Sequence, residues 1–264
     1  MFAARTGTPV LWESVPNFSE GRDRRTIDEL AGEDALDQHA DALHHRCVVT
    51  LADDDPERLL DGLLRRVAVA VERIDLRTHE GLHPRLGAAD VLPIVPLGAA
   101  AMTAAEDLAR ELAEEIWRRH RVPVYFYGSL AGGRRLAELR RARSAVPFDV
   151  GDRLHPTAGA CCVGARRPLV ALNLAFPLAR ARVSAALPAM RALPGVQALT
   201  FPARGGLVQL SMNLTRPDEA GVARVVVEAE RLLGLRSVPE LVGLCPAAAA
   251  GPGCDGGLLE GRLG

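Results

Sequence analysis

Hydrophobic and polar residues follow two different periods along the second half of the chain. Short runs that are apolar at every position or every second position predict strands, at residues 168–176, 196–202, 207–214 and 240–244. Two longer stretches, 179–193 and 217–235, repeat their apolar residues with the period of an amphipathic helix. Pro188 predicts a kink or a break in the first of these helices. The resulting order, β-α-β-β-α-β, is that of a split-βαβ or ferredoxin-like unit.

The first half of the chain divides in the same order as far as residue 97, with one more helix and strand after it. Strands are predicted at 10–15, 35–40, 46–53, 91–97 and 122–128, and helices at 22–32, 55–74 and 103–119. Pro93 and Pro96 predict an edge strand or irregular pairing, because proline cannot donate to a ladder. We therefore expect an α+β fold of two stacked ferredoxin-like subdomains, with mixed sheets and helices on the outer faces.

Residues at the starts of two predicted helices have the pattern of helix caps. Pro56 suits the first turn of its helix, with Asp54 or Asp55 as the cap. Thr103 and Glu106 have the spacing of a capping box.

The pattern also predicts where the chain divides. We expect an N-terminal subdomain at residues 1–166 and a C-terminal subdomain at 167–246. Residues 247–264 continue a stretch rich in alanine, glycine and proline, which predicts an irregular or disordered tail.

Composition excludes several classes of function. The chain has no lysine, so all 32 basic residues are arginine, which excludes Schiff-base catalysis and a Walker-type phosphate loop. The net charge is −1 with acids and bases interspersed, so we expect no binding to nucleic acid or to an anionic membrane. No apolar run reaches the roughly 18 residues of a spanning helix.

Cysteine usage predicts a reducing compartment. The cysteines are odd in number and form no C-x-x-C pair: Cys47, Cys161, Cys162, Cys245 and Cys254. Reduced thiols in a cytoplasm fit this best, and the N-terminus lacks the apolar core of an export signal. We interpret the tandem Cys161 and Cys162 as packing residues, because neighbours in a strand point to opposite faces.

The stretch THEGLHPRLGAADV, residues 78–91, holds more titratable residues than a turn needs. Gly81 and Pro84 bracket His83, so its ring lies on a loop. An imidazole titrates near neutral pH, which suits proton transfer. We therefore predict that His83 is a proton-transfer group, the alternative being a loop histidine that bonds the backbone.

Histidines at 39, 44, 45, 79 and 83 raise the alternative of a metal site. A zinc pair at i and i+4 needs a helix, which Gly81 and Pro84 oppose, and no H-E-x-x-H motif occurs. We expect no metal.

Several other residues are candidates for binding. VPNFSEGR, residues 15–22, predicts a turn at Pro16 and Asn17 between a strand and a helix, so Asn17 or Ser19 either caps the helix or receives a carboxylate. Glycines in 151–166 either let the chain approach a flat ligand or belong to a linker. The arginines considered as carboxylate clamps are Arg46, Arg85 and Arg166.

Seven segments of the chain together resemble the formiminotransferase domain of glutamate formimidoyltransferases and formimidoyltransferase-cyclodeaminases. In order they are VPNFSEGR, THEGLHPRLGAADVLPIVPL, VPVYFYG, LAELRR, HPTAGACCVGARRPLVALN, VQLSMNL and ELVGLCP. The resemblance covers about residues 10–246, and no cyclodeaminase segment follows.

The resemblance implies two ferredoxin-like subdomains and transfer of a formimino group from N-formimino-L-glutamate to N5 of tetrahydrofolate, without a metal. It places the catalytic histidine at His83. It places the folate contacts on Gly151, Asp152, Arg153, Leu154, His155, Pro156, Thr157, Ala158, Gly159 and Ala160. The residues that we expect to contact the formimino substrate are Asn17, Asp41, His44, Arg46, Arg85 and Arg166.

The chain also departs from the family pattern. Where members read D-P-D-H-N-R, this chain keeps Asp41, His44 and Arg46 but has Leu43 and His45 in place of an acid and an asparagine. The stretch at 142–152 is shorter than usual. A glutamate formyltransferase that uses 5-formyltetrahydrofolate, a folate-binding protein without turnover and a metal-dependent hydrolase remain alternatives, and a homodimer is plausible.

Overall fold

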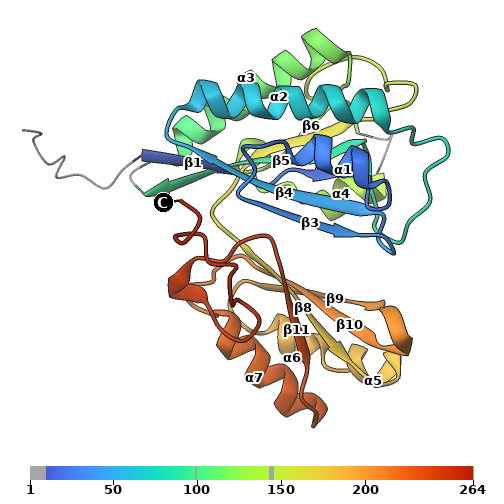
Figure 1. Ribbon diagram of the computed structural model, residues 1–264, viewed down its shortest axis with the longest axis vertical. Helices are drawn as coiled ribbons and strands as arrows, with labels where there is room; N and C mark the ends of the chain where they lie inside the picture. Colours follow the sequence, from blue (N-terminus) through green and yellow to red (C-terminus); the bar gives the residue numbers. More distant parts are fainter. Residues whose placement is uncertain (1–9, 99, 143–145, 264) are drawn as a thin grey trace, which may run out of the picture. The chain divides into compact units, whose positions relative to one another are not determined.

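The computed structural model describes residues 10–98, 100–142 and 146–263 of the chain. The chain divides into two compact units, Met1–Arg167 and Pro168–Gly264 (Figure 1). One contains a mixed sheet and the other an antiparallel sheet, each with helices, so the predicted α+β class is confirmed. Residues 1–9, where we expect no export signal, and residues 143–145, in the shortened stretch, lie outside the described part.

The first unit is a ferredoxin-like unit whose sheet is extended on one side. Its strands are β1 (Val10–Ser14), β2 (Asn17–Phe18), β3 (Asp37–Asp41), β4 (Arg46–Asp53), β5 (Ala89–Gly98), β6 (Val124–Gly128) and β7 (Cys161–Ala165). β1 and β2 both pair with β4 and with β5, so they form one interrupted strand between them. β3 lies outside β4, while β7 and β6 continue the sheet beyond β5 as parallel strands.

The sheet departs from two expectations and bears out part of a third. Pro16 interrupts the first strand, but β2 resumes at Asn17 and no turn separates strand from helix there. β5 is a central strand, so the edge-strand alternative for residues 91–97 is wrong. Its pairing is irregular, as the other alternative predicts: it pairs with β2 at residues 89 and 91 with a register shift, with β7 at 91–94 and with β1 at 95–98. Residues 161–165 are a buried strand between β5 and β6, which overturns the expectation of a linker for that part of 151–166.

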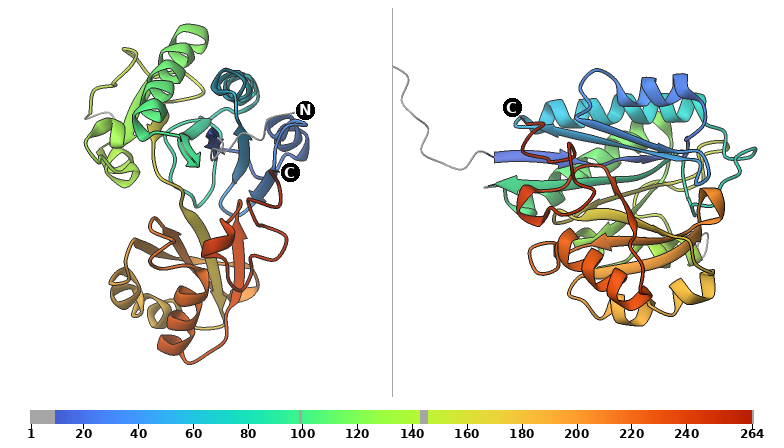
Figure 2. Two further views of the ribbon diagram at one scale, coloured as in Figure 1. Left: turned by 90° about the vertical axis from the view of Figure 1, so that its left-hand side faces the viewer. Right: turned by 60° about the horizontal axis from the view of Figure 1, so that its bottom comes forward.

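Helices lie on both faces of this sheet. They are α1 (Arg24–Ala31), α2 (Pro56–Arg73), α3 (Met102–His120) and α4 (Leu136–Ala142). α1, α2 and α3 bury their apolar residues against one face, with α2 and α3 side by side (Figure 2). α4, which we did not predict, packs Leu139 against Tyr125 and Tyr127 on the opposite face.

The helix starts confirm one cap and contradict another. Asp55 caps α2 by accepting from the amide of Glu57, and Pro56 occupies the first turn. α3 begins one residue earlier than expected, after Ala101, and no side chain of the described residues caps it. Thr103 is therefore already inside the helix, and the predicted capping box with Glu106 does not form.

The second unit has the predicted β-α-β-β-α-β order. Its elements are β8 (Val170–Phe176), α5 (Arg180–Ser184), α6 (Leu187–Arg191), β9 (Val196–Pro202), β10 (Val208–Leu214), α7 (Val222–Leu233) and β11 (Val238–Val242). The strands run antiparallel in the order β11-β8-β10-β9, and the helices lie on one face (Figure 1). The break between α5 and α6 confirms the interruption near Pro188.

The last residues are irregular but packed. Cys245, Ala249 and Cys254 are buried in the core of the second unit. The amide of Cys245 donates to the carbonyl of Gly257, and the amide of Leu259 donates back to Cys245. Among the described residues, no helix has the length and apolar character needed to cross a bilayer.

We expect Gly159→Ala to destabilise the first unit strongly. Gly159 has φ +71°, and an added Cβ would lie 2.3 Å from the carbonyl oxygen of Leu86. The predicted loss of unfolding free energy is about 3 kcal/mol or more. Trp12 and Trp117 both belong to this unit, so urea unfolding followed by tryptophan fluorescence measures it.

Gly132→Ala is the matched control for this substitution. Gly132 has a similar φ of +60° but no described atom within 4 Å of an added Cβ, so only the left-handed backbone cost of about 1 kcal/mol remains. Equal losses in the two variants would contradict the close packing of Gly159 on Leu86.

Candidate active site

The loop between α2 and β5 carries His83 and is fixed at both ends by the segment that precedes β7. The amide of Leu76 donates to the carbonyl of Thr157, and the amide of Ala88 donates to that of Ala158. The amide of Ala160 donates back to Leu86. A loop without regular structure is thus held by backbone hydrogen bonds to a second segment of the same unit.

His83 contacts the first residue of β4. Its Nε2 lies 3.0 Å from Nη1 of Arg46. A guanidinium group only donates, so Nε2 accepts, and the neutral ring carries its proton on Nδ1. The amide of His83 donates weakly to the carbonyl of His44, at 3.4 Å. The predicted proton-transfer residue and the predicted substrate arginine are therefore direct partners.

Burial and positive neighbours keep His83 neutral. Burial is the largest cause, followed by the charges of Arg46 and Arg140, and together they lower the pKa of His83 to about 2. The ring is therefore unprotonated at pH 7, with its Nε2 lone pair directed at a cation.

Asp41 and His44 form a second pair beside this contact. Oδ2 of Asp41 accepts from Nδ1 of His44 at 2.8 Å, and Oδ1 accepts from the amides of Leu43 and His44. The hydrogen bond from His44 holds the pKa of Asp41 well below its usual range. The His44 ring meets the His83 ring edge-on, with centroids 6.4 Å apart. Four of the predicted residues, Asp41, His44, Arg46 and His83, therefore lie together.

A buried ion pair also contacts the loop that carries His83. Asp90 at the start of β5 accepts from the amides of Leu86 and Gly87, and its Oδ2 accepts from Nη2 of Arg140 at 2.6 Å. Asp90 is 2% exposed. Arg140 comes from α4, and the sequence patterns did not single it out, although it belongs to the segment LAELRR.

Arg85 braces the loop from within. Its Nη2 donates to the carbonyls of Gly81 and His83, at 2.9 and 2.6 Å, and its Nη1 contacts Nδ1 of His79. Most of its donors are thus used by the loop itself. Its charge still contributes to the positive surroundings of His83.

Asn17 lies on the sheet face that carries Arg46. Its partner across the ladder is Val48, while the neighbouring Phe18 faces the helices. Its side-chain amide donates to the carbonyl of Val15. The expected cap role at α1 is wrong for both Asn17 and Ser19, because Asp23 caps α1 and Ser19 donates to Gly87.

Arg166 is not part of this cluster. Its amide donates to Ile94 and its side chain to the carbonyl of Arg167. Ile94 is four residues beyond Asp90 on β5, which corresponds to roughly 13 Å along the strand. Arg166 instead lies near the buried Glu13 and Tyr127, where its charge lowers their pKa values against the effect of burial.

The segment 151–160 offers two kinds of surface. Side chains 152–154 and 156 are exposed, whereas Ala158 and Ala160 are buried. Nδ1 of His155 accepts from the amide of Ala158, which closes a tight turn. The glycine at 159 permits the approach to Leu86, so the protein's own packing explains it.

The cysteines lie in the interior of the two units. All five thiols are free and buried, and burial raises the pKa values of Cys161 and Cys162. Within residues 10–98, 100–142 and 146–263, no group of at least three metal-ligating side chains is found.

Two comparisons relate this chain to known proteins. Residues 11–166 match the formiminotransferase domain, N-terminal subdomain. A glutamate formimidoyltransferase of Thermoplasma acidophilum is 34% identical over 90% of this chain and 89% of its own length.

Two further relatives match over a smaller share of their length. A glutamate formimidoyltransferase of Streptococcus pyogenes serotype M1 is 37% identical over 61% of each chain. The formimidoyltransferase-cyclodeaminase of Sus scrofa is 32% identical over 90% of this chain, which spans about half (51%) of that protein. The domain model matches more than half of the chain, and the relative from Thermoplasma acidophilum matches along nearly its whole length. This chain therefore belongs to the formiminotransferase-domain family.

Proposed function

We propose that this chain transfers the formimino group of N-formimino-L-glutamate to N5 of tetrahydrofolate, with His83 as the proton-transfer group. Relatives named glutamate formimidoyltransferase support the reaction. The observation that carries the role of His83 is a neutral imidazole surrounded by the charges of Arg46, Arg85 and Arg140. Tetrahydrofolate acts as a co-substrate in this reaction, which needs no metal.

The chemistry requires one proton to move. N5 of the pteridine attacks the formimino carbon and forms a C–N bond, and the bond from that carbon to the glutamate nitrogen then breaks. The proton released from N5 passes to Nε2 of His83 and from there to the departing glutamate amine, so atoms and charge balance. An imidazole within reach of both N5 and the glutamate nitrogen accelerates such a transfer by about 10²–10⁴-fold.

Substrate binding must make His83 a stronger base than it is in the free site. A group with a pKa near 2 accepts a proton poorly at pH 7, and its lone pair is occupied by Arg46. A carboxylate of formiminoglutamate beside Arg46 would neutralise that charge and compete for its donors. We propose that this carboxylate both binds the substrate and releases Nε2.

The remaining predicted residues have distinct proposed roles. Asn17 and Arg46 share one sheet face, and the Asp41–His44 pair lies beside it. We propose that these residues contact the formimino substrate. Residues 151–160 provide the folate contacts, through the exposed side chains at 152–154 and 156. Arg85 acts mainly by bracing the 79–85 loop through its hydrogen bonds to Gly81 and His83. Arg166 lies away from the cluster around His83.

The direct test mixes the protein with formiminoglutamate and tetrahydrofolate and follows the folate absorbance. Omitting either substrate gives the background. The same protein with glutamate and 5-formyltetrahydrofolate tests the formyl alternative. Folate binding without product above background would contradict the proposed reaction and favour a carrier.

We expect His83→Ala to lower kcat by about 100-fold or more, because the proton relay is lost. The unfolding curve of the first unit should change little, since Arg46 is the one described residue to which the His83 side chain hydrogen-bonds. Steady-state kinetics with both substrates measure the effect. Turnover at the wild-type rate would remove His83 from the mechanism.

We expect Arg46→Ala to raise the pKa of His83, because Arg46 is the nearest charge that lowers it. A histidine NMR titration of the free protein measures this shift. The KM for formiminoglutamate should rise by about tenfold or more through loss of the carboxylate partner. An unchanged KM would show that Arg46 does not hold the substrate carboxylate.

The low pKa of His83 also predicts how stability varies with pH. The unfolded histidine, with a pKa near 6.5, takes up a proton as the pH falls from 7 to 5, whereas the folded one does not. Stability is therefore lost over this window, by about 1–2 kcal/mol from this residue. In His83→Gln this part of the loss should disappear, as measured by urea unfolding at both pH values. Identical pH dependence in the two proteins would show that His83 is not held neutral.

A further inference from the structure

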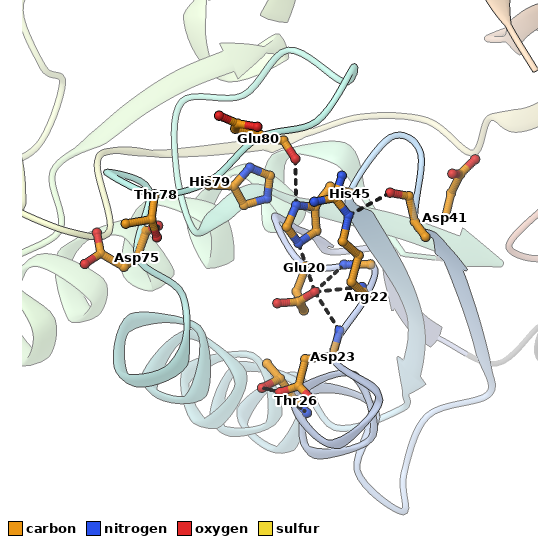
Figure 3. Close-up of polar contacts among 12 residues, drawn as sticks. Glu20, Arg22, Asp23, Thr26, Asp41, His45, Asp75, Thr78, His79 and Glu80 are labelled. Atoms are coloured by element: carbon orange, nitrogen blue, oxygen red, sulfur yellow. Dashed lines mark hydrogen bonds and ion pairs between the residues drawn. The ribbon is translucent and has the colours of Figure 1, made fainter.

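Three segments that are distant in the sequence meet around His45. They are the turn 20–23 before α1, the connection 41–46 between β3 and β4, and the loop 79–85 that carries His83. Figure 3 shows the His45 ring between Glu20 and the backbone of Glu80, with His79 beside it.

Glycines allow these segments to touch through their backbones. A Cβ on Gly21 would lie 2.3 Å from the carbonyl oxygen of Asp41, and one on Gly81 would lie 2.6 Å from that of His44. The backbone hydrogen bonds that join the second and third segments are long. They run from the amide of Leu82 to the carbonyl of Leu43 at 3.3 Å and from that of His83 to His44 at 3.4 Å. The backbone contacts are therefore close but weakly bonded.

Glu20 presents a fixed negative charge to this junction. Its Oε1 accepts from the amides of Gly21, Arg22 and Asp23 at 2.7–3.0 Å. Burial raises the pKa of Glu20, but these backbone donors and the charge of His45 outweigh it and hold the pKa below its usual value. The carboxylate is therefore ionised and only accepts hydrogen bonds.

His45 has an acceptor at each ring nitrogen. Nε2 lies 3.1 Å from Oε1 of Glu20, and Nδ1 lies 2.8 Å from the carbonyl oxygen of Glu80. Neither partner can donate, so both contacts form together only when the ring carries two protons. The backbone of His45 has φ +52°, a region in which asparagine, aspartate and histidine are the favoured residues after glycine.

The His45 ring also stacks on the 79–85 loop. The His45 and His79 rings are 3.9 Å apart and nearly parallel, and Nδ1 of His79 contacts Arg85. Burial, Arg85 and His45 lower the pKa of His79. Besides His45, the charged and titratable groups of the three segments are Glu20, Arg22, Asp23, Asp41, His44, Arg46, His79, Glu80, His83 and Arg85.

We propose that doubly protonated His45 is a positioning residue that joins the ionised Glu20 to the backbone of the 79–85 loop and so holds His83 against Arg46. The proposal rests on the proposed function in assigning His83 its role. When the ring carries only one proton, a lone pair faces one of the two acceptors. One contact then breaks, and the loop is released from the turn at 20–23.

His45→Asn and Glu20→Gln test this junction without altering the backbone it needs. Asparagine tolerates the left-handed conformation but cannot reach both acceptors, and it does not titrate. Glutamine keeps an oxygen for the three amides but removes the charge. His120→Asn, at the end of α3, is the control for losing a half-buried histidine.

The amides of Leu82 and His83 are the reporters, because they join the 79–85 loop to 43–44. Hydrogen exchange by NMR should show their protection factors reduced by about tenfold in His45→Asn and Glu20→Gln. They should be unchanged in His120→Asn.

Turnover supplies the second readout. We expect kcat to fall by about tenfold in His45→Asn with KM nearly unchanged. Protection factors within twofold of wild type in both variants would overturn the proposal. If protection falls as expected but the wild-type protein shows no transferase activity, the proposed function fails while the junction stands.

Discussion

The arrangement of this site depends on how an irregular loop is held in place. Residues 74–88 contain no helix or strand, so backbone bonds to Thr157 and Ala158 and the contact of His83 with Arg46 fix them. Glycine at 81 lets the loop approach the neighbouring connection to a distance that a side chain would prevent. The position of the imidazole therefore depends on packing between segments far apart in the sequence.

The same packing sets the electrostatics. Burial removes water from His83, and the nearby guanidinium groups of Arg46, Arg140 and Arg85 add positive charge that Asp90 and Asp41 offset only in part. A site with a surplus of buried positive charge favours an anionic ligand, because the ligand's charge replaces the lost solvent. Glutamate derivatives and the folate tail both carry such charge. In the proposed reaction, a substrate carboxylate would supply the charge that balances these arginines.

Local periodicity was enough to predict the second unit, in which apolar positions alternate along β8 and β10. It failed where distant context decides the outcome. The strand character of Cys161 and Cys162 was considered, but the position of Cys161–Ala165 between β5 and β6 depends on pairing with distant strands. The motifs around His83 and Arg46 identified those two residues. Arg140 and Glu20 were not identified, although both lie in segments of the family pattern, because their partners are 50 and 25 residues away.

Two histidines of this cluster have opposite hydrogen-bonding partners. Nε2 of His83 faces the guanidinium of Arg46 and accepts, so its ring is neutral. Both ring nitrogens of His45 face acceptors, so its two contacts form together only when the ring carries two protons. The residue type alone sets neither environment, because Arg46 supplies the partner of one ring and Glu20 and the backbone of Glu80 supply those of the other.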